Sequence, residues 1–223
     1  MQYTFFFKLH ISNWHSFSNF PIDACLPRLK VLHIFVNDPE EANFPDNLVT
    51  SCPVLEDLTI SETRLDLHIN ISAPELKSLR MYMSDSKGLY PINAPKLETF
   101  DLSDDMLCPN KYLLENGRSL LNVKLELELD IINGGSVDDV IALFAKFSNV
   151  EYLSLDFHYL NLRDLNDFRL PEFLNLSRFV LVLSGFNYCK FLMELLKRSP
   201  NLKHLVLEKK WHSGQDKCEW NFF

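Results

Sequence analysis

The stretch that decides the fold reads ISAPELKSLRM at residues 71–81, and a close copy, INAPKLETFDL, follows 21 positions later at residues 92–102. Both copies contain a six-residue frame whose first, fourth and sixth positions are apolar, and in these two copies the fifth position is polar. Alternation of apolar and polar residues is the period of a β-strand with one buried face. The proline two residues before each frame cannot donate a ladder hydrogen bond, so it fits the start of a strand and not its interior. Each copy therefore predicts a short strand that begins just after a proline.

The same frame recurs along the whole chain at spacings of 21 to 30 residues. Its nine copies begin at Phe6, Leu29, Leu55, Leu76, Leu97, Leu120, Val150, Leu176 and Leu202. A unit this short cannot bury its own apolar edge, so neighbouring units must stack and their strands must form a parallel sheet. An ordinary α/β sheet with leucine-rich strands is the alternative, and the near-constant spacing argues against it. We expect an α/β solenoid, with a curved parallel sheet on the concave side and irregular or short helical segments on the convex side.

The segments between the frames differ in kind. Residues 137–147 (VDDVIALFAKF) have apolar residues at helical spacing after Ser136, a residue type that caps helices. Residues 187–198 (NYCKFLMELLKR) predict a second amphipathic helix that ends in basic residues, as the helix dipole favours. Residues 46–52 predict a shorter helical turn, and residues 38–44 and 84–88 predict loops. The units between residues 55 and 102 leave no room for a full helix, so the alternating residues 64–71 predict an extended piece on the outer side.

The composition excludes several classes of protein. The chain has 223 residues, of which 47% are hydrophobic, and this excludes disorder for most of it. The formal net charge is −8, whereas nucleic-acid binding needs a basic surface, so we expect no nucleic acid partner. No stretch approaches the about 18 uninterrupted apolar residues of a membrane span, so we expect no membrane partner. The five cysteines are odd in number and include no C-x-x-C pair, which is typical of a cytoplasmic or nuclear protein.

No reaction-competent cluster is visible. The seven histidines are scattered without partners at zinc-ligand spacing, and no G-x-S-x-G motif occurs. The acidic pairs at residues 104–105 and 138–139 fit a loop and a helix start rather than a pair of catalytic carboxylates. We therefore expect no enzyme, no catalytic residue, no metal site and no cofactor.

Three phrases of the sequence carry a family resemblance. SCPVLEDLTI (residues 51–60) and SAPELKSLRM (residues 72–81) resemble the leucine-rich repeats of plant F-box proteins of the FBD type, and RSPNLKHLVLEK (residues 198–209) is similar to the start of their FBD tail. The resemblance implies a leucine-rich-repeat domain of about nine units at residues 1–210 and the start of a truncated FBD-like tail at residues 211–223. It also implies the substrate-recruiting subunit of a Skp–cullin–F-box ubiquitin ligase. No F-box is visible, so a Skp-type adaptor is expected as a partner only if a longer isoform supplies one.

The concave face of such a solenoid presents the third and fifth positions of each frame, and often the seventh. These positions carry mixed charges and aromatic residues, including Lys8 and His10 in the first frame, as a surface for a protein target should. The candidate anchors of the target are Arg80, Tyr82, Asp101, Lys124, Glu126 and Tyr152. Two alternatives stay open: these side chains are merely solvated, or the chain is a truncated gene product without independent activity.

Overall fold

The computed structural model describes most of the chain. The described residues are 5–11, 26–37, 48–63, 69–84, 88–105, 111–115, 117–128, 137–158, 169–183, 189–211 and 214–221. The chain divides into two compact units, of which unit 1 comprises residues 1–104 and 110–119 and unit 2 comprises residues 105–109 and 120–223. None of the helices in the described ranges is long and apolar enough to cross a membrane.

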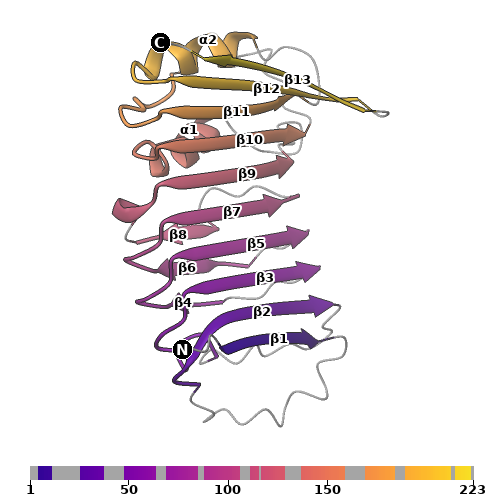
Figure 1. The fold of residues 1–223 in the computed structure, drawn as a ribbon, viewed down its shortest axis with the longest axis vertical. Coiled ribbons are helices and arrows are strands. Elements are labelled where there is room, and N and C mark those ends of the chain that lie inside the picture. The colour runs from indigo at the N-terminus through magenta and orange to yellow at the C-terminus, as the bar shows by residue number, and fades with distance from the viewer. Residues whose placement is uncertain are drawn as a thin grey trace. The chain divides into compact units, whose positions relative to one another are not determined.

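Unit 1 contains a parallel sheet with the strand order β1-β2-β3-β5-β7 (Figure 1). Its strands are β1 (Phe5–Ile11), β2 (Leu29–Asn37), β3 (Asp57–Thr63), β5 (Ser78–Ser84) and β7 (Thr99–Asp104). The predicted frames from Leu29 to Leu97 therefore each contain one strand of this sheet. In the frame at Leu76, for example, Leu76, Leu79 and Met81 are all fully buried.

The prolines act in the turns that precede the strands. The amide of Leu76 donates to the carbonyl of Ala73 at 3.2 Å and the amide of Leu97 donates to that of Ala94 at 3.0 Å. Pro74 and Pro95 therefore occupy the second position of a tight turn, where the fixed φ of proline is favourable. The corresponding turns at Pro27, Pro53 and Pro200 have the same hydrogen bond.

A second, three-stranded sheet lies behind the large sheet of unit 1 (Figure 1). It is parallel, with the order β4-β6-β8, and consists of β4 (Ile71–Ser72), β6 (Tyr90–Asn93) and β8 (Tyr112–Leu114). Of the extended outer piece predicted at residues 64–71, the structure describes residues 69–71, in which Ile71 begins β4, whereas β6 and β8 were not predicted. Their buried residues, Ile71, Tyr90 and Ile92, complete the core of unit 1. A 3₁₀ turn at Gly117–Ser119 ends the unit, and the Ser119 hydroxyl donates to the Pro95 carbonyl at 2.7 Å.

The first strand pairs two residues away from the predicted register. Its frame begins at Phe6, which aligns Leu9 with Leu32, but the structure pairs Phe7 with Leu32 and Leu9 with Ile34. A shift of two residues keeps every residue on the same face of the strand, so the apolar pattern cannot distinguish the two registers. The third and fifth positions of this strand are therefore occupied by Phe6 and Lys8 rather than by Lys8 and His10.

Unit 2 contains the sheet order β9-β10-β11-β12-β13. Its strands are β9 (Asn122–Glu128), β10 (Tyr152–His158), β11 (Arg178–Leu183), β12 (His204–Trp211) and β13 (Gly214–Asn221). The first four are parallel and again follow the predicted frames, while β13 pairs antiparallel with β12. Each unit is thus a stretch of leucine-rich-repeat solenoid of the α/β class.

Both predicted helices form in unit 2, as α1 (Val137–Lys146) and α2 (Cys189–Arg198). They join the core through aromatic contacts, since the Phe144 ring lies 6.3 Å from that of Phe173 and 5.7 Å from that of Phe191, measured between centroids. The helical turn predicted at residues 46–52 is a single turn at 48–51 in the described part. Residues 38–44 and 85–87, predicted as loops, lie outside the described residues.

Candidate protein-binding face

The side chains at the third, fifth and seventh positions of the frames point away from the core, and we call the surface they form the open face. In unit 1 the strand register aligns them in three rows that cross β2, β3, β5 and β7. The rows are Val31, Asp57, Ser78 and Thr99; His33, Thr59, Arg80 and Asp101; and Phe35, Ser61, Tyr82 and Ser103. The repeat therefore places side chains that are more than 20 residues apart in sequence directly beside one another.

Arg80 lies at the centre of the open face of unit 1. One of its guanidinium nitrogens donates to both carboxylate oxygens of Asp57, at 2.9 and 3.0 Å. The Arg80 side chain keeps 38% of its surface exposed and that of Asp57 keeps 25%, so the ion pair is accessible from outside. Asp101 is the neighbour of Arg80 in the register and is partly exposed. A fixed, accessible guanidinium of this kind is a suitable anchor for a partner carboxylate or carbonyl.

Aromatic residues also lie on the open face of unit 1, on β1, β2 and β5. Tyr82, two residues beyond Arg80 on β5, is 39% exposed, and Phe6 on β1 is 57% exposed. The Phe6 ring meets the His33 ring edge-on at 5.0 Å, and the Lys8 ammonium lies 4.8 Å from the centre of the Phe35 ring. Large, partly exposed aromatic side chains are the residues that most often anchor protein interfaces. The sequence interpretation missed Phe6, because the incorrect register placed it outside the third position.

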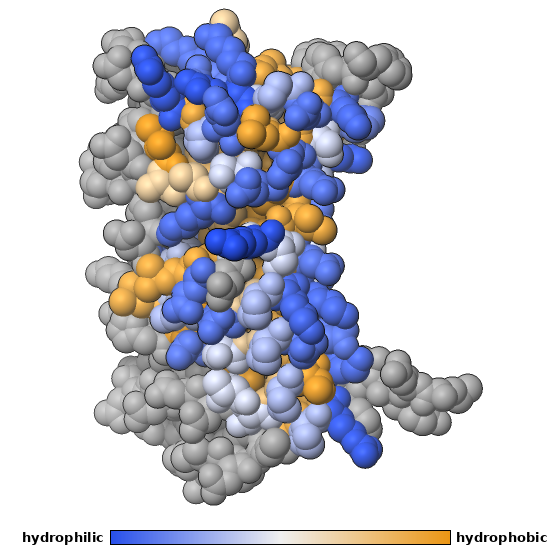
Figure 2. All heavy atoms as spheres, turned by 90° about the vertical axis from the view of Figure 1, so that its left-hand side faces the viewer, coloured by the Kyte–Doolittle hydropathy of each residue, from blue (hydrophilic) through white to orange (hydrophobic). Residues whose placement is uncertain are grey.

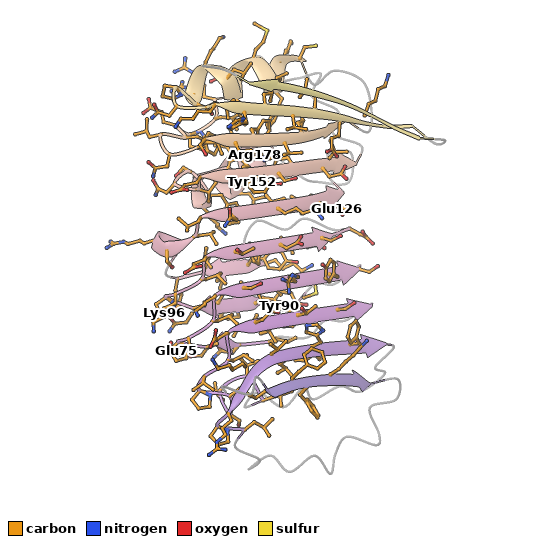
Figure 3. The ribbon with its side chains drawn as sticks, viewed as in Figure 1. Glu75, Tyr90, Lys96, Glu126, Tyr152 and Arg178 are labelled. Carbon is orange, nitrogen blue, oxygen red and sulfur yellow. The ribbon has the colours of Figure 1, made fainter. Side chains whose placement is uncertain are left out.

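In unit 2 the open face again has three rows. They are Asn122, Tyr152, Arg178 and His204; Lys124, Ser154, Val180 and Val206; and Glu126, Asp156, Val182 and Glu208. The Arg178 guanidinium lies 6.0 Å from the centre of the Tyr152 ring, and Figure 3 shows the two side chains on neighbouring strands. Both remain partly exposed, so this pair is the aromatic and cationic centre of the face in unit 2.

Part of the predicted face in unit 2 is not accessible. Val180, Val182 and Val206 are at most 8% exposed, and Ser154 and Asp156 are also buried. The expectation that the outward positions face a partner is therefore wrong for the fifth position of β10, β11 and β12 and for the seventh position of β10 and β11, whereas the residues at the third position are at least partly exposed. The sequence contains the signal, since β11 reads RFVLVL, and an unbroken apolar run is typical of a strand that is buried on both faces.

The six candidate anchors fall into two groups. Arg80, Tyr82 and Asp101 lie side by side on β5 and β7 of unit 1. Lys124, Glu126 and Tyr152 lie on β9 and β10 of unit 2. All six are at least partly exposed, so all are accessible to a partner.

A ladder of ion pairs follows the turns from which the strands of unit 1 start. Glu56 accepts hydrogen bonds from Lys30 and, at 3.0 Å, from Lys77, while Lys96 is paired with Glu75 at 2.7 Å. The hydrogen bonds from Lys30 and Lys77 lower the pKa of Glu56 below its ordinary value of 4.5, and the bond to Glu56 raises the pKa of Lys77. Figure 3 shows Glu75 and Lys96 at this side of the molecule, and hydrophilic side chains predominate there in Figure 2. The ladder links adjacent repeats, so we assign it to repeat stacking.

Unit 1 also holds a buried ion pair that the sequence did not predict. The Lys111 ammonium donates to Asp104 at 2.9 Å and the Tyr112 hydroxyl donates to the same carboxylate oxygen at 2.7 Å. The exposed fractions of the Lys111 and Asp104 side chains are 1% and 0%. The ammonium also lies 5.9 Å from the centre of the Tyr90 ring and 5.5 Å from that of Tyr112. Asp104 is thus the buried last residue of a strand rather than part of a loop, and it joins the two sheets of unit 1.

Comparisons with known proteins agree with this architecture. The family described as "FBD-associated F-box protein At5g56370, LRR repeats" matches residues 4–125, which is more than half of the chain. The putative F-box/FBD/LRR-repeat protein At3g59240 of Arabidopsis thaliana is 30% identical over 211 residues, which cover 88% of this chain and 41% of that protein. The F-box/LRR-repeat protein At3g58980 of the same plant is also 30% identical, over 88% of this chain and 36% of its own length.

This chain spans less than half the length of these relatives. No solved structure matches it significantly. The frames, the parallel strands and the matches all concern the same repeats, and together they show that the chain belongs to the plant F-box/leucine-rich-repeat proteins of the FBD-associated type.

Proposed function

We propose that this chain is a protein-interaction module, not an enzyme, and that its open face holds a target protein. The observation that carries the proposal is the open face of unit 1, where Arg80, Tyr82 and Phe6 stay exposed on a rigid parallel sheet. Rigid scaffolds that present exposed aromatic and arginine side chains lose little side-chain entropy on binding, and this favours their use as anchors. In unit 2 the Tyr152–Arg178 pair offers a second set of anchors.

Within the family, such repeats fit the substrate-recruiting arm of a Skp–cullin–F-box ubiquitin ligase. For this chain the role depends on an F-box supplied by a longer form, and the adaptor would bind that F-box rather than the repeats. We place this role in the cytoplasm or nucleus. The odd number of cysteines and the lack of a C-x-x-C pair in the sequence support a reducing compartment.

The proposal is tested by quantitative affinity capture from plant extract with four forms of the full chain. These are the wild type, Arg80→Ala/Tyr82→Ala in unit 1, Tyr152→Ala in unit 2, and the control Glu75→Ala/Lys96→Ala at the strand-start turns. We expect proteins that the wild type and the control retain to be lost from the unit 1 variant, the Tyr152→Ala variant, or both. Identical captured sets for all four forms would contradict the assignment of the open face.

A second measurement separates this role from that of a truncated gene product without activity. The purified chain should unfold cooperatively and stay monodisperse, and it should show no direct binding to a Skp-type adaptor. Aggregation of the wild type would favour the inactive remnant, and direct adaptor binding would place the adaptor contact within the repeats and overturn our proposal.

A further inference from the structure

The outward side of α2 exposes more apolar surface than a helix on a single core requires. The helix buries Phe191 and Leu195, yet Met193 is 58% exposed and Leu196 is 37% exposed, and Cys189 is also exposed. Cys189, Met193 and Leu196 are spaced i, i+4 and i+7, so they form one stripe along the helix, which we call the α2 stripe. An amphipathic helix with a second apolar stripe has a second surface to cover.

The earlier helix, α1, shows which residues cover the corresponding side of a helix within the solenoid. Leu143 of α1 and Leu195 of α2 each lie seven residues before the first position of the next frame, at Val150 and Leu202. This spacing aligns Phe144 of α1 with Leu196 of α2.

Phe144 is fully buried, because Phe173 of the following repeat and Phe191 of the repeat after that pack against its ring. Leu196 occupies the corresponding position two repeats after Phe144 and is 37% exposed. The α2 stripe is therefore the surface on which one more helix would stack.

The charges beside the stripe indicate the chemistry of that helix. Lys190 and Lys197 are exposed and follow the stripe along one side. The carboxylate of Glu194 is paired with the guanidinium of Arg198 at 3.2 Å, and the same guanidinium lies 3.8 Å from the carboxylate of Glu172. The exposed charges beside the stripe are thus positive, although the chain as a whole has a net charge of −8.

We propose that the α2 stripe docks a helix from a partner protein, with apolar residues at i, i+3 or i+4, and i+7 and with Asp or Glu placed against Lys190 and Lys197. The apolar residues take the place, against Leu196, of the contacts that Phe191 and Phe173 make with Phe144 of α1. The acidic residues supply the local charge complementarity that sets orientation and suppresses wrong partners. This surface is independent of the open face.

An anionic membrane fits these observations less well. Three side chains on a ten-residue helix provide little area for insertion, and each lysine adds only about 1 kcal/mol at an anionic surface. The net charge of −8 also repels such a surface at long range, whereas a docked helix responds to charges within about 8 Å.

The test is a selection of random peptides by display on the full wild-type chain. We expect enriched peptides to combine the apolar spacing with acidic residues. Their affinity should fall at least about tenfold for Met193→Ser/Leu196→Ser, and by a similar factor for Lys190→Glu/Lys197→Glu, as for interface anchors. Leu113→Ser, which removes a leucine that is 41% exposed in unit 1, is the matched control and should bind as the wild type does.

Since the substituted residues are exposed, all variants should fold as the wild type does, and circular dichroism checks this. Failure to enrich any peptide, enrichment without acidic residues, or binding that survives Met193→Ser/Leu196→Ser would overturn the proposal. If the wild-type chain captures phosphatidylserine vesicles as strongly as it captures the peptides, the stripe would be assigned to membranes. Self-association of the wild type that Met193→Ser abolishes would assign it to a second copy of this chain.

Discussion

Replacing Lys111 by methionine should destabilise unit 1 far more than any surface charge change. The substitution keeps an unbranched side chain, one atom shorter, but removes the ammonium that pairs with Asp104 at 2.9 Å. The Asp104 carboxylate is fully buried. The substitution would therefore leave it without its cationic partner in an interior that solvates charge poorly. Breaking a buried pair on one side costs about 3–5 kcal/mol, a large fraction of the roughly 5–15 kcal/mol by which a domain is stable.

The structure offers a matched control in Lys96→Met. Lys96 and Glu75 form an ion pair of similar length, 2.7 Å, but their side chains are 56% and 43% exposed. Exposed pairs contribute at most about 1 kcal/mol, so the control should unfold close to the wild type. The double variant Asp104→Leu/Lys111→Met should regain much of the lost stability, because an apolar pair can replace a buried ion pair with little loss.

The assay is urea unfolding of the full chain, with amide hydrogen exchange at β6, β7 and β8 as a local reading. The local reading is needed because a chain of two units need not unfold in one step. Equal loss of stability in Lys111→Met and Lys96→Met would refute the reasoning, as would a double variant that is less stable than Lys111→Met.

Three further predictions concern the stacking of the repeats. Glu56→Gln should lower the free energy of unfolding at pH 7. Because the pKa of Glu56 is below 4.5 in the folded chain, the ionised carboxylate stabilises the fold above pH 4.5. The difference in the free energy of unfolding between the variant and the wild type should therefore vanish as the pH falls through the lowered pKa. Leu79→Ala, at a fully buried frame position, should destabilise unit 1 by about 2–5 kcal/mol in urea unfolding, and a loss below about 1 kcal/mol would argue against a packed core there. Ser119→Ala should lower the free energy of unfolding by about 1 kcal/mol in the same assay, because the Ser119 hydroxyl donates to the Pro95 carbonyl at 2.7 Å. An unchanged urea midpoint would show that this hydrogen bond does not stabilise the fold.

The large sheet was predictable because its signal repeats. Most frames alternate apolar and polar residues over enough positions to define a strand, and the period of the frames defines the stacking. The small sheet of unit 1 was not predictable in this way. Its strands β6 and β8 are four and three residues long, and β6 contains Pro91, so neither shows an alternating pattern.

The errors at the candidate site have physical causes. The register of β1 was wrong because Phe5, Phe6 and Phe7 are all apolar, and a pattern of period two fixes the face of a residue but not its partner. Asp104 was assigned to a loop because its partner Lys111 directly precedes β8, a strand that the sequence does not reveal. Val180 and Val206, at the fifth positions of their frames, were placed on an accessible surface because position in the frame was given more weight than the apolar runs of β11 and β12.

The most direct test of the central claim, that the strands of unit 1 have one side in the core and one side open to a partner, is cysteine labelling along β5. Single cysteines replace Leu79, Arg80, Met81 and Tyr82 in turn, and mass spectrometry follows alkylation of each site in the native chain. We expect rapid labelling at positions 80 and 82 and labelling at positions 79 and 81 only when the chain unfolds, because Leu79 and Met81 are fully buried. Similar rates at all four positions, or rapid labelling at 79 and 81, would contradict the account.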